Sequence, residues 1–258
     1  MAGVEGRVVA VTGAGNGLGR EYALVLARAG ARVVVNDLGG ARDGSGAGSA
    51  AADAVVAEII SAGGRAEAFQ ADVTDEAAVK AMCTEIFVQI GPIQAVVANA
   101  TGPQPEIPAE DVTWQQHLDQ LVFFVKSPTL LMQATLPGMK ELGTGRFIHI
   151  GSDMVERALP GWSAYNAAKA AQIGLARTWA RELGRYGVTT NVVAPGWIPV
   201  ERHGEITEEN AGGYRAEIPL GRMGTPEEIA DVVAFVASDA SRFVNGERIT
   251  VNGGHTID

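Results

Sequence analysis

Cysteine and long apolar runs are scarce in this chain. Its 258 residues include one cysteine, Cys83, so no disulfide can form within the chain. The lack of a disulfide framework favours a reducing compartment, and we expect a cytoplasmic protein. No apolar run reaches the roughly 18 residues that a membrane-spanning helix requires. The first seven residues also lack the basic and apolar segments of a secretory signal, so we expect no membrane partner.

Basic residues are also few. Lysine and arginine together number 20 against 30 aspartates and glutamates, which gives a net charge of −10. This balance argues against nucleic acid and anionic membrane as partners. No group of His, Cys, Asp and Glu residues has the spacing of metal ligands, so we expect no metal site.

Short apolar runs alternate with longer amphipathic stretches along the whole chain. The runs are rich in Val and Ile, and they lack the polar alternation of a half-exposed sheet. We expect strands at Arg7–Val11, Arg32–Asn36, Ala66–Gln70, Ala95–Ala98, Arg146–Ile150, Thr189–Val193 and Arg248–Val251. Helices are expected at Leu18–Ala29, Ser49–Ala62 and Glu76–Ile90, each followed by glycine.

This order predicts an α/β fold. Strands that are apolar on both faces belong to a parallel sheet covered on both sides. We therefore expect a Rossmann-type, doubly wound parallel sheet with helices on both faces, in a single domain that spans residues 1–258. Residues 39–48 are expected to form a glycine-rich loop. The polar segment 198–223 predicts a lid over a substrate, although a solvated surface segment would have the same composition.

A glycine-rich loop follows the first expected strand. It carries Gly13, Gly17 and Gly19, with Asn16 and Leu18 beside them, and a helix comes next. Such a loop lets a pyrophosphate approach bare backbone N–H groups at the helix N-terminus. A tight turn that binds nothing is the alternative.

Acidic residues follow the second and third expected strands. Asp37 can accept hydrogen bonds from ribose hydroxyls and repel a 2′-phosphate, and the loop carries no basic residue. We therefore expect NAD(H) to be preferred over NADP(H). Asp72 either contacts the adenine or caps the next helix.

The motifs together resemble the short-chain dehydrogenase/reductase family over nearly the whole chain. They are Thr12-Gly13-x-x-x-Gly17-x-Gly19, then Ser152, Tyr165 thirteen residues later, Lys169 four residues beyond, Pro195-Gly196, and the final segment Arg248–Gly254. Within the family, the N-terminal half is similar to (3R)-hydroxyacyl-CoA dehydrogenases, notably at Val35–Gly40 and Asp43–Gly48. The C-terminal half looks more like 3-oxoacyl-carrier-protein reductase-like members.

The resemblance implies an enzyme that interconverts a small secondary alcohol and a ketone by hydride transfer. Ser152, Tyr165 and Lys169 would be catalytic, with Tyr165 as general acid and base. Because Tyr165 and Lys169 lie one helical turn apart, the ammonium group can stabilise a phenolate. The resemblance also implies a homotetramer, in which the Tyr165 helix and the last strand commonly form subunit contacts.

Further site residues come from the same resemblance. The cofactor contacts would be Gly13, Asn16, Gly17, Leu18, Gly19, Asp37, Asp72, Val73, Asn99, Tyr165, Lys169, Pro195, Gly196 and Ile198. The substrate pocket would be lined by Asp153, Trp162, Phe124, Trp197 and His203.

Three positions depart from the family pattern. Phe124 stands 28 residues before Ser152, where the family usually has an asparagine that completes a proton relay through water. Thr101 replaces a glycine, and Val200 replaces a threonine near the nicotinamide carboxamide. These changes leave two alternatives open, a non-redox relative that performs elimination, addition or isomerisation, and a dinucleotide-binding regulator.

Overall fold

A computed structural model describes residues 3–39 and 48–257 of the chain. The strands are β1 (Val8–Thr12), β2 (Arg32–Asn36), β3 (Arg65–Phe69), β4 (Ala95–Ala98), β5 (Gly145–Ile150), β6 (Val188–Pro195) and β7 (Arg248–Val251). The helices are α1 (Gly17–Arg28), α2 (Ala50–Ser61), α3 (Glu76–Gln89), α4 (Trp114–Leu121), α5 (Ser127–Leu142), α6 (Met154–Arg157), α7 (Ser163–Leu183), α8 (Glu208–Glu217) and α9 (Pro226–Ala237). Most of the expected loop 39–48 lies outside the described residues.

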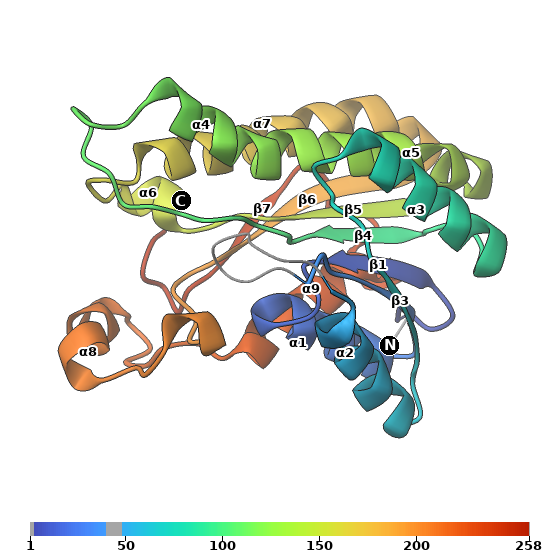
Figure 1. The fold of residues 1–258 in the computed structure, drawn as a ribbon, viewed down its shortest axis with the longest axis horizontal. Coiled ribbons are helices and arrows are strands. Elements are labelled where there is room, and N and C mark those ends of the chain that lie inside the picture. The colour runs from blue at the N-terminus through green and yellow to red at the C-terminus, as the bar shows by residue number, and fades with distance from the viewer. Residues whose placement is uncertain (1–2, 40–47, 258) are drawn as a thin grey trace.

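All seven strands pair in parallel in one sheet, in the order β3-β2-β1-β4-β5-β6-β7. Helices α1, α2 and α9 cover one face, while α3, α4, α5 and α7 cover the other (Figure 1). Two apolar clusters fill the spaces between the sheet and these layers, and valines from β1 contribute to both. The prediction of a doubly wound parallel sheet in a single domain is confirmed.

The expected elements match the structure closely. Three strands agree residue for residue, the other four differ by one or two residues at an end, and the three expected helices differ by at most one. The glycine loop is followed by α1, and Thr225 caps α9 through a hydrogen bond from the Glu228 N–H. The local signals for stopping and starting helices therefore hold in this chain.

The chain reverses its direction of winding between β3 and β4. Strand β1 lies between β2 and β4, so the loops that leave β1 and β4 diverge at the carboxyl ends of these strands. Open parallel sheets bind ligands at such a switch point. The topology alone therefore places a candidate site at the loops after β1 and β4.

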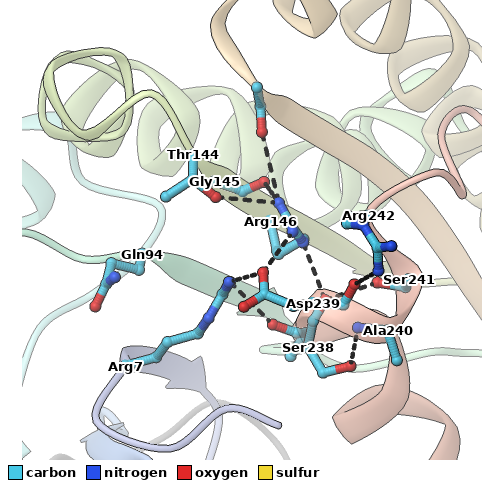
Figure 2. A network of polar contacts seen from close by, with 12 residues as sticks. Arg7, Gln94, Thr144, Gly145, Arg146, Ser238, Asp239, Ala240, Ser241 and Arg242 are labelled. Carbon is cyan, nitrogen blue, oxygen red and sulfur yellow. Dashed lines mark hydrogen bonds and ion pairs between the residues drawn. The ribbon is translucent and has the colours of Figure 1, made fainter. Parts of the chain in front are cut away.

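Two buried guanidinium groups lie at the amino ends of the strands, opposite the carboxyl ends where the candidate site is expected. Arg7 precedes β1 and Arg146 lies in β5, and both donate to the same Asp239 carboxylate oxygen (Figure 2). Arg146 also donates to the carbonyls of Gly145 and Ser238. Burial is the main cause of the lowered Arg146 pKa, and the neighbouring Arg7 charge lowers it further. Asp239 thus ties the end of α9 to the first and fifth strands.

The segment 198–223 contains a helix of its own. A short 3₁₀ turn covers Glu201–His203 and α8 follows it, apart from the two helical layers (Figure 1). Among the helices of the described residues, none is long and apolar enough to cross a membrane.

Candidate functional site

The glycine loop leaves no room for side chains. A Cβ on Gly19 would lie 2.0 Å from the Gly13 carbonyl oxygen, and one on Gly13 would lie 2.9 Å from the Ala100 Cα. Gly13 and Gly17 also have positive φ angles of 62° and 54°, which disfavour other residues. These glycines are required by the loop's own geometry.

Asn99 fastens the glycine loop to the end of β4. Its amide donates to the carbonyls of Thr12 and Gly13, at 2.9 and 3.1 Å. The Thr12 hydroxyl in turn accepts the backbone N–H groups of Asn99 and Ala100. Asn99, which we expected to be a cofactor contact, therefore supports the loop with its amide donor.

The start of α1 has the features of an anion site. Asn16 is exposed and occupies the N-cap position, but its side chain makes no capping hydrogen bond. The first turn of α1 carries no acidic residue. Its first backbone N–H groups, at Gly17, Leu18 and Gly19, lack partners within the helix. A helix N-terminus without a side-chain cap, behind a tight glycine loop, fits the pyrophosphate of a dinucleotide. Val200 and the Glu201 carboxylate lie beside it, 3.7 and 3.8 Å from the Cβ position of Gly17.

Asp37 lies directly beside this loop. One carboxylate oxygen accepts the Gly15 N–H at 2.7 Å, and the other accepts the Gly39 N–H at 2.7 Å. A Cβ on Gly15 would lie 2.8 Å from Asp37 Oδ2, so glycine permits the contact. The acidic group is thus fixed where the loop leaves β1.

In the segment after β3, the acidic side chains bond to groups of the segment itself and of α3. Asp72 accepts the backbone N–H and hydroxyl of Thr74, while Asp75 caps α3. The interpretation of Asp72 as the cap of α3 is therefore wrong. Val73 is buried in the apolar cluster below α3.

Ser152 lies just beyond the carboxyl end of β5, and it is 9% exposed. Its hydroxyl accepts the Met154 N–H at 3.2 Å. Behind it, the Arg248 guanidinium on β7 donates to the Ser152 carbonyl and also pairs with Glu156. The backbone at Ser152 is thereby held by a side chain on β7.

Lys169 and Tyr165 project from α7 toward the same strand end. Lys169 Nζ donates to the Ile150 carbonyl at 2.6 Å, two residues before Ser152. The Tyr165 ring makes edge contacts with Phe124 and Trp162, with ring centres 5.5 and 5.8 Å apart. The structure therefore gathers Ser152, Lys169, Tyr165, Phe124 and Trp162 around the end of β5.

Phe124 occupies a π-helical turn, Val122–Lys126, between α4 and α5. Lys169 Nζ lies 3.8 Å from the centre of the Phe124 ring, which is 2% exposed. A cation over a ring face is attracted by the ring's quadrupole. The residue at the family's asparagine position therefore contacts the ammonium group as an apolar aromatic surface.

The segment after β6 crosses from Ser152 to the glycine loop. Gly196 follows Pro195 at the strand end, and a Cβ there would lie 2.6 Å from the Tyr214 hydroxyl. Ile198 is buried, and Val200 lies 3.7 Å from the Cβ position of Gly17. This path brings the start of segment 198–223 to the N-terminus of α1.

The remaining expected pocket residues lie on the other side of Gly196. Trp197 donates its backbone N–H to the Tyr214 hydroxyl at 2.7 Å, and its ring contacts those of Tyr214 and His203. His203 also accepts the Val200 N–H at its Nδ1. Asp153 is 1% exposed and turned toward the C-terminal segment, so it faces protein groups.

His149 lies in the core below the site. Among the described residues neither ring nitrogen has a hydrogen-bond partner. Its ring packs between Phe147 and Trp179. Burial, with a smaller effect of the Lys169 charge, lowers the pKa of His149 from 6.5 to about 3.

Sequence reasoning missed Arg248 and His255 as parts of the site. Arg248 is the one charged residue of its short strand, and this could have marked it as a functional residue in the sequence. His255 follows the last strand, and nothing local reveals its distant partners. Within the described residues no group of three or more His, Cys, Asp or Glu side chains is arranged to hold a metal ion.

Comparisons with known proteins agree with this geometry. A family model described as enoyl-(acyl carrier protein) reductase matches residues 13–256. Cyclohexanol dehydrogenase of Rhodococcus sp. (strain TK6) is 38% identical, over 98% of this chain and 97% of its own.

Two solved structures have the same fold. One is a 7α-hydroxysteroid dehydrogenase complexed with NADH and 7-oxoglycochenodeoxycholic acid, with a TM-score of 0.90, 32% identity and coverage of 98% and 95% of the two chains. The other is a putative gluconate 5-dehydrogenase from Beutenbergia cavernae with bound NADP, with a TM-score of 0.87, 32% identity and 98% coverage of both chains.

Proposed function

The chain belongs to the short-chain dehydrogenase/reductase family and is an oxidoreductase that uses a nicotinamide dinucleotide; on this premise we propose that it interconverts a secondary alcohol and a ketone with NAD(H). The observation that supports the proposal is the position of Lys169 on α7, which donates to the Ile150 carbonyl two residues before Ser152 and lies 5.6 Å from the centre of the Tyr165 ring. We propose a cytoplasmic enzyme that acts on a small molecule. The narrower likeness of its first half to (3R)-hydroxyacyl-CoA dehydrogenases stays a prediction.

The glycine loop, the N-terminus of α1, which has no side-chain cap, and Asp37 would hold the dinucleotide. When bound, the nicotinamide accepts or supplies the hydride. The proposed contacts are Gly13, Asn16, Gly17, Leu18, Gly19, Asp37, Asp72, Val73, Asn99, Tyr165, Lys169, Pro195, Gly196 and Ile198. Asp37 favours NAD(H), because its carboxylate would repel the 2′-phosphate of NADP(H).

The chain's own residues handle the proton. Tyr165 donates a proton to the ketone oxygen during reduction and removes it from the alcohol during oxidation. Ser152 holds that oxygen by a hydrogen bond. Lys169 stabilises the phenolate that Tyr165 becomes, because an ammonium group favours a nearby anion.

The segment 198–223 is the proposed lid. Val200 lies beside Gly17 of the glycine loop, and His203 of the same segment contacts the ring of Trp197, which directly precedes the segment. Together with Asp153, Trp162 and Phe124, they form the proposed surroundings of the substrate. Closure of this segment would exclude water from the reacting atoms.

A non-redox reaction is the second candidate, and the contact of Phe124 with Lys169 favours it. An aromatic ring can neither donate to nor accept from a water chain in the way an asparagine amide does. Such an enzyme would turn over its substrate without a change in NADH absorbance.

Calorimetric titration with NADH and NADPH tests the cofactor. We expect NADH to bind at least about tenfold more tightly, which corresponds to roughly 1.4 kcal/mol. Asp37→Asn should reduce that ratio, while Asp53→Asn, on the exposed side of α2, is the control. A preference for NADPH would refute the role of Asp37, and binding of neither would refute the dinucleotide site.

A ketone panel with NADH then tests the reaction. Tyr165→Phe should lower turnover by at least about a hundredfold, as loss of a general acid does. It should leave NADH binding within about twofold. Equal turnover by the variant would overturn the role of Tyr165.

A further inference from the structure

The segment that follows β7 returns to the catalytic end of β5. The Asn252 amide donates to Asp153 Oδ2 at 3.2 Å, and His255 Nδ1 lies 3.4 Å from the same oxygen. Asp153 directly follows Ser152 and is 1% exposed. The carboxylate beside the catalytic serine therefore faces the C-terminal segment of the chain.

The other side of His255 contacts the lid helix. His255 Nε2 lies 3.0 Å from Glu217 Oε2, at the last residue of α8. The imidazole also packs against the Tyr214 ring, with ring centres 4.7 Å apart. Its side chain is 6% exposed, so these contacts occupy most of its surface.

Tyr214 extends this set of contacts to the backbone after β6. Its hydroxyl accepts the Trp197 N–H at 2.7 Å, and the residue before Trp197 is Gly196. The Gly196 Cβ position is blocked by Tyr214, Asn252 and Asp153, so these groups are packed closely together. Displacement of α8 would therefore disturb both the Trp197 backbone and the surroundings of Asp153.

We propose that His255 is a positioning residue, which holds α8 and the Trp197 backbone against the Ser152 end of the site by bridging Asp153 and Glu217. This inference rests on the proposed function for its effect on turnover. Its structural part concerns α8 alone and can be tested without any substrate.

The imidazole joins the two carboxylates through its two ring nitrogens. A neutral ring donates from one nitrogen, and a protonated ring donates from both. Asp153 Oδ2 also accepts the Asn252 amide, so it keeps a donor in either state of the ring. The other groups facing His255 are the Tyr214 phenol, the Asn252 amide and, over the far part of the Tyr214 ring, the Arg157 guanidinium.

Glu217 sets the acid limit of the bridge. Its hydrogen bond with His255 lowers the Glu217 pKa below the usual 4.5. A carboxyl group with a depressed pKa stabilises the folded contact above its unfolded pKa, and this contribution is lost as the pH falls. The bridge is therefore retained at neutral pH and weakens in acid as Glu217 becomes protonated.

Amide hydrogen exchange of α8 at pH 7 tests the bridge directly. After correction for intrinsic rates, His255→Ala should lower protection of α8 by about fivefold or more, for loss of the hydrogen bonds of the imidazole. His255→Gln, which keeps one donor, should retain part of the protection.

Two further variants guard against a general loss of structure. Glu217→Gln removes the charge of one partner but leaves His255 in place, and it should lower protection of α8 by less than His255→Ala does. His117→Gln is the matched control, because the hydrogen bond and ring contact of His117 join it to Thr113 and Trp114 at the start of α4. Protection of α8 that is equal in the wild type and His255→Ala would overturn the proposal.

Kinetics separate this proposal from the proposed function. His255→Ala should raise the KM for the ketone by about fivefold or more, with kcat changed by less than about threefold, since the reacting groups stay in place. His255→Gln should restore part of the KM. Wild-type protein that reduces no ketone would refute the proposed function, while hydrogen exchange would still decide the role of His255.

Discussion

An apolar ring lies against the ammonium group of Lys169. The centre of the Phe124 ring is 3.8 Å from the ammonium nitrogen. The ring stabilises the cation, but it offers no hydrogen bond. We propose that Phe124 takes the place of the family's relay asparagine and thereby slows any turnover limited by proton exchange.

The variant Phe124→Asn should therefore raise kcat. We expect an increase of at least about threefold, a small part of what positioned proton transfer contributes. Steady-state rates between pH 6 and 9, in water and in deuterium oxide, measure it. Phe124→Leu is the control, because it removes the ring without adding a polar group and should give no increase. Unchanged turnover in a folded Phe124→Asn protein would contradict the relay argument.

His149 should make the protein sensitive to acid. The unfolded imidazole binds a proton below about pH 6.5, whereas the folded one does not until about pH 3. The depressed pKa means that stability is present above 6.5 and is lost as the pH falls toward 3.

In His149→Leu this loss should disappear. The fall in unfolding free energy between pH 7 and pH 4 should be about 3 kcal/mol smaller than in the wild type. Urea unfolding at several pH values gives this quantity. His117→Leu, on α4, should keep the wild-type pH dependence. Parallel curves for the wild type and His149→Leu would show that the imidazole is not the acid-sensitive group.

One carboxylate, that of Asp239, joins the segment after α9 to the two arginines at the start of β1 and in β5. Arg7 and Arg146 are 7% and 3% exposed, and both donate to Asp239. Without that charge, two buried guanidinium groups would repel each other at the start of β1 and β5. Breaking a buried pair in this way is costly because a charge is left uncompensated.

Asp239→Asn should accordingly destabilise the protein. Because the Asp239 side chain is half exposed, we expect about 2 kcal/mol, less than the full value for buried pairs. Glu227→Gln is a matched control, since it breaks an exposed pair with Arg28 and should cost less than about 1 kcal/mol. Urea denaturation compares the two, and equal losses would mean that burial of the arginines has no energetic effect.

Elements that depend on local pattern were predictable from the sequence. The apolar strands, the glycine loop and the spacing of Tyr165 and Lys169 each follow from short segments. The π-helical turn at Phe124 and the helix within the lid were not foreseen, because neither has a distinctive local pattern. The bridge from Asp153 to His255 joins residues 102 positions apart, and periodicity carries no information about such partners.

At the scale of the whole molecule, we propose a homotetramer. Phe243 is fully exposed in the single chain, and it lies on the connection that leads into β7, the strand at the open edge of the sheet. Sedimentation equilibrium should give a mass near four times 26.8 kDa. Phe243→Glu should shift the protein to smaller species, whereas Phe87→Glu, on α3, should not. A wild-type monomer would refute the assembly.

The strand order also has a consequence for synthesis on the ribosome. β1 pairs with β2 on one edge and with β4 on the other. β1 ends at residue 12 and β4 begins at residue 95, so β4 is made 83 residues later. At ordinary rates of translation this interval lasts about 4 to 17 s. During that time the strand that carries the glycine loop has an unpaired, apolar edge, a template for aggregation. A chaperone that shields nascent apolar segments should therefore act on the first hundred residues, well before Ser152 and Tyr165 have been made.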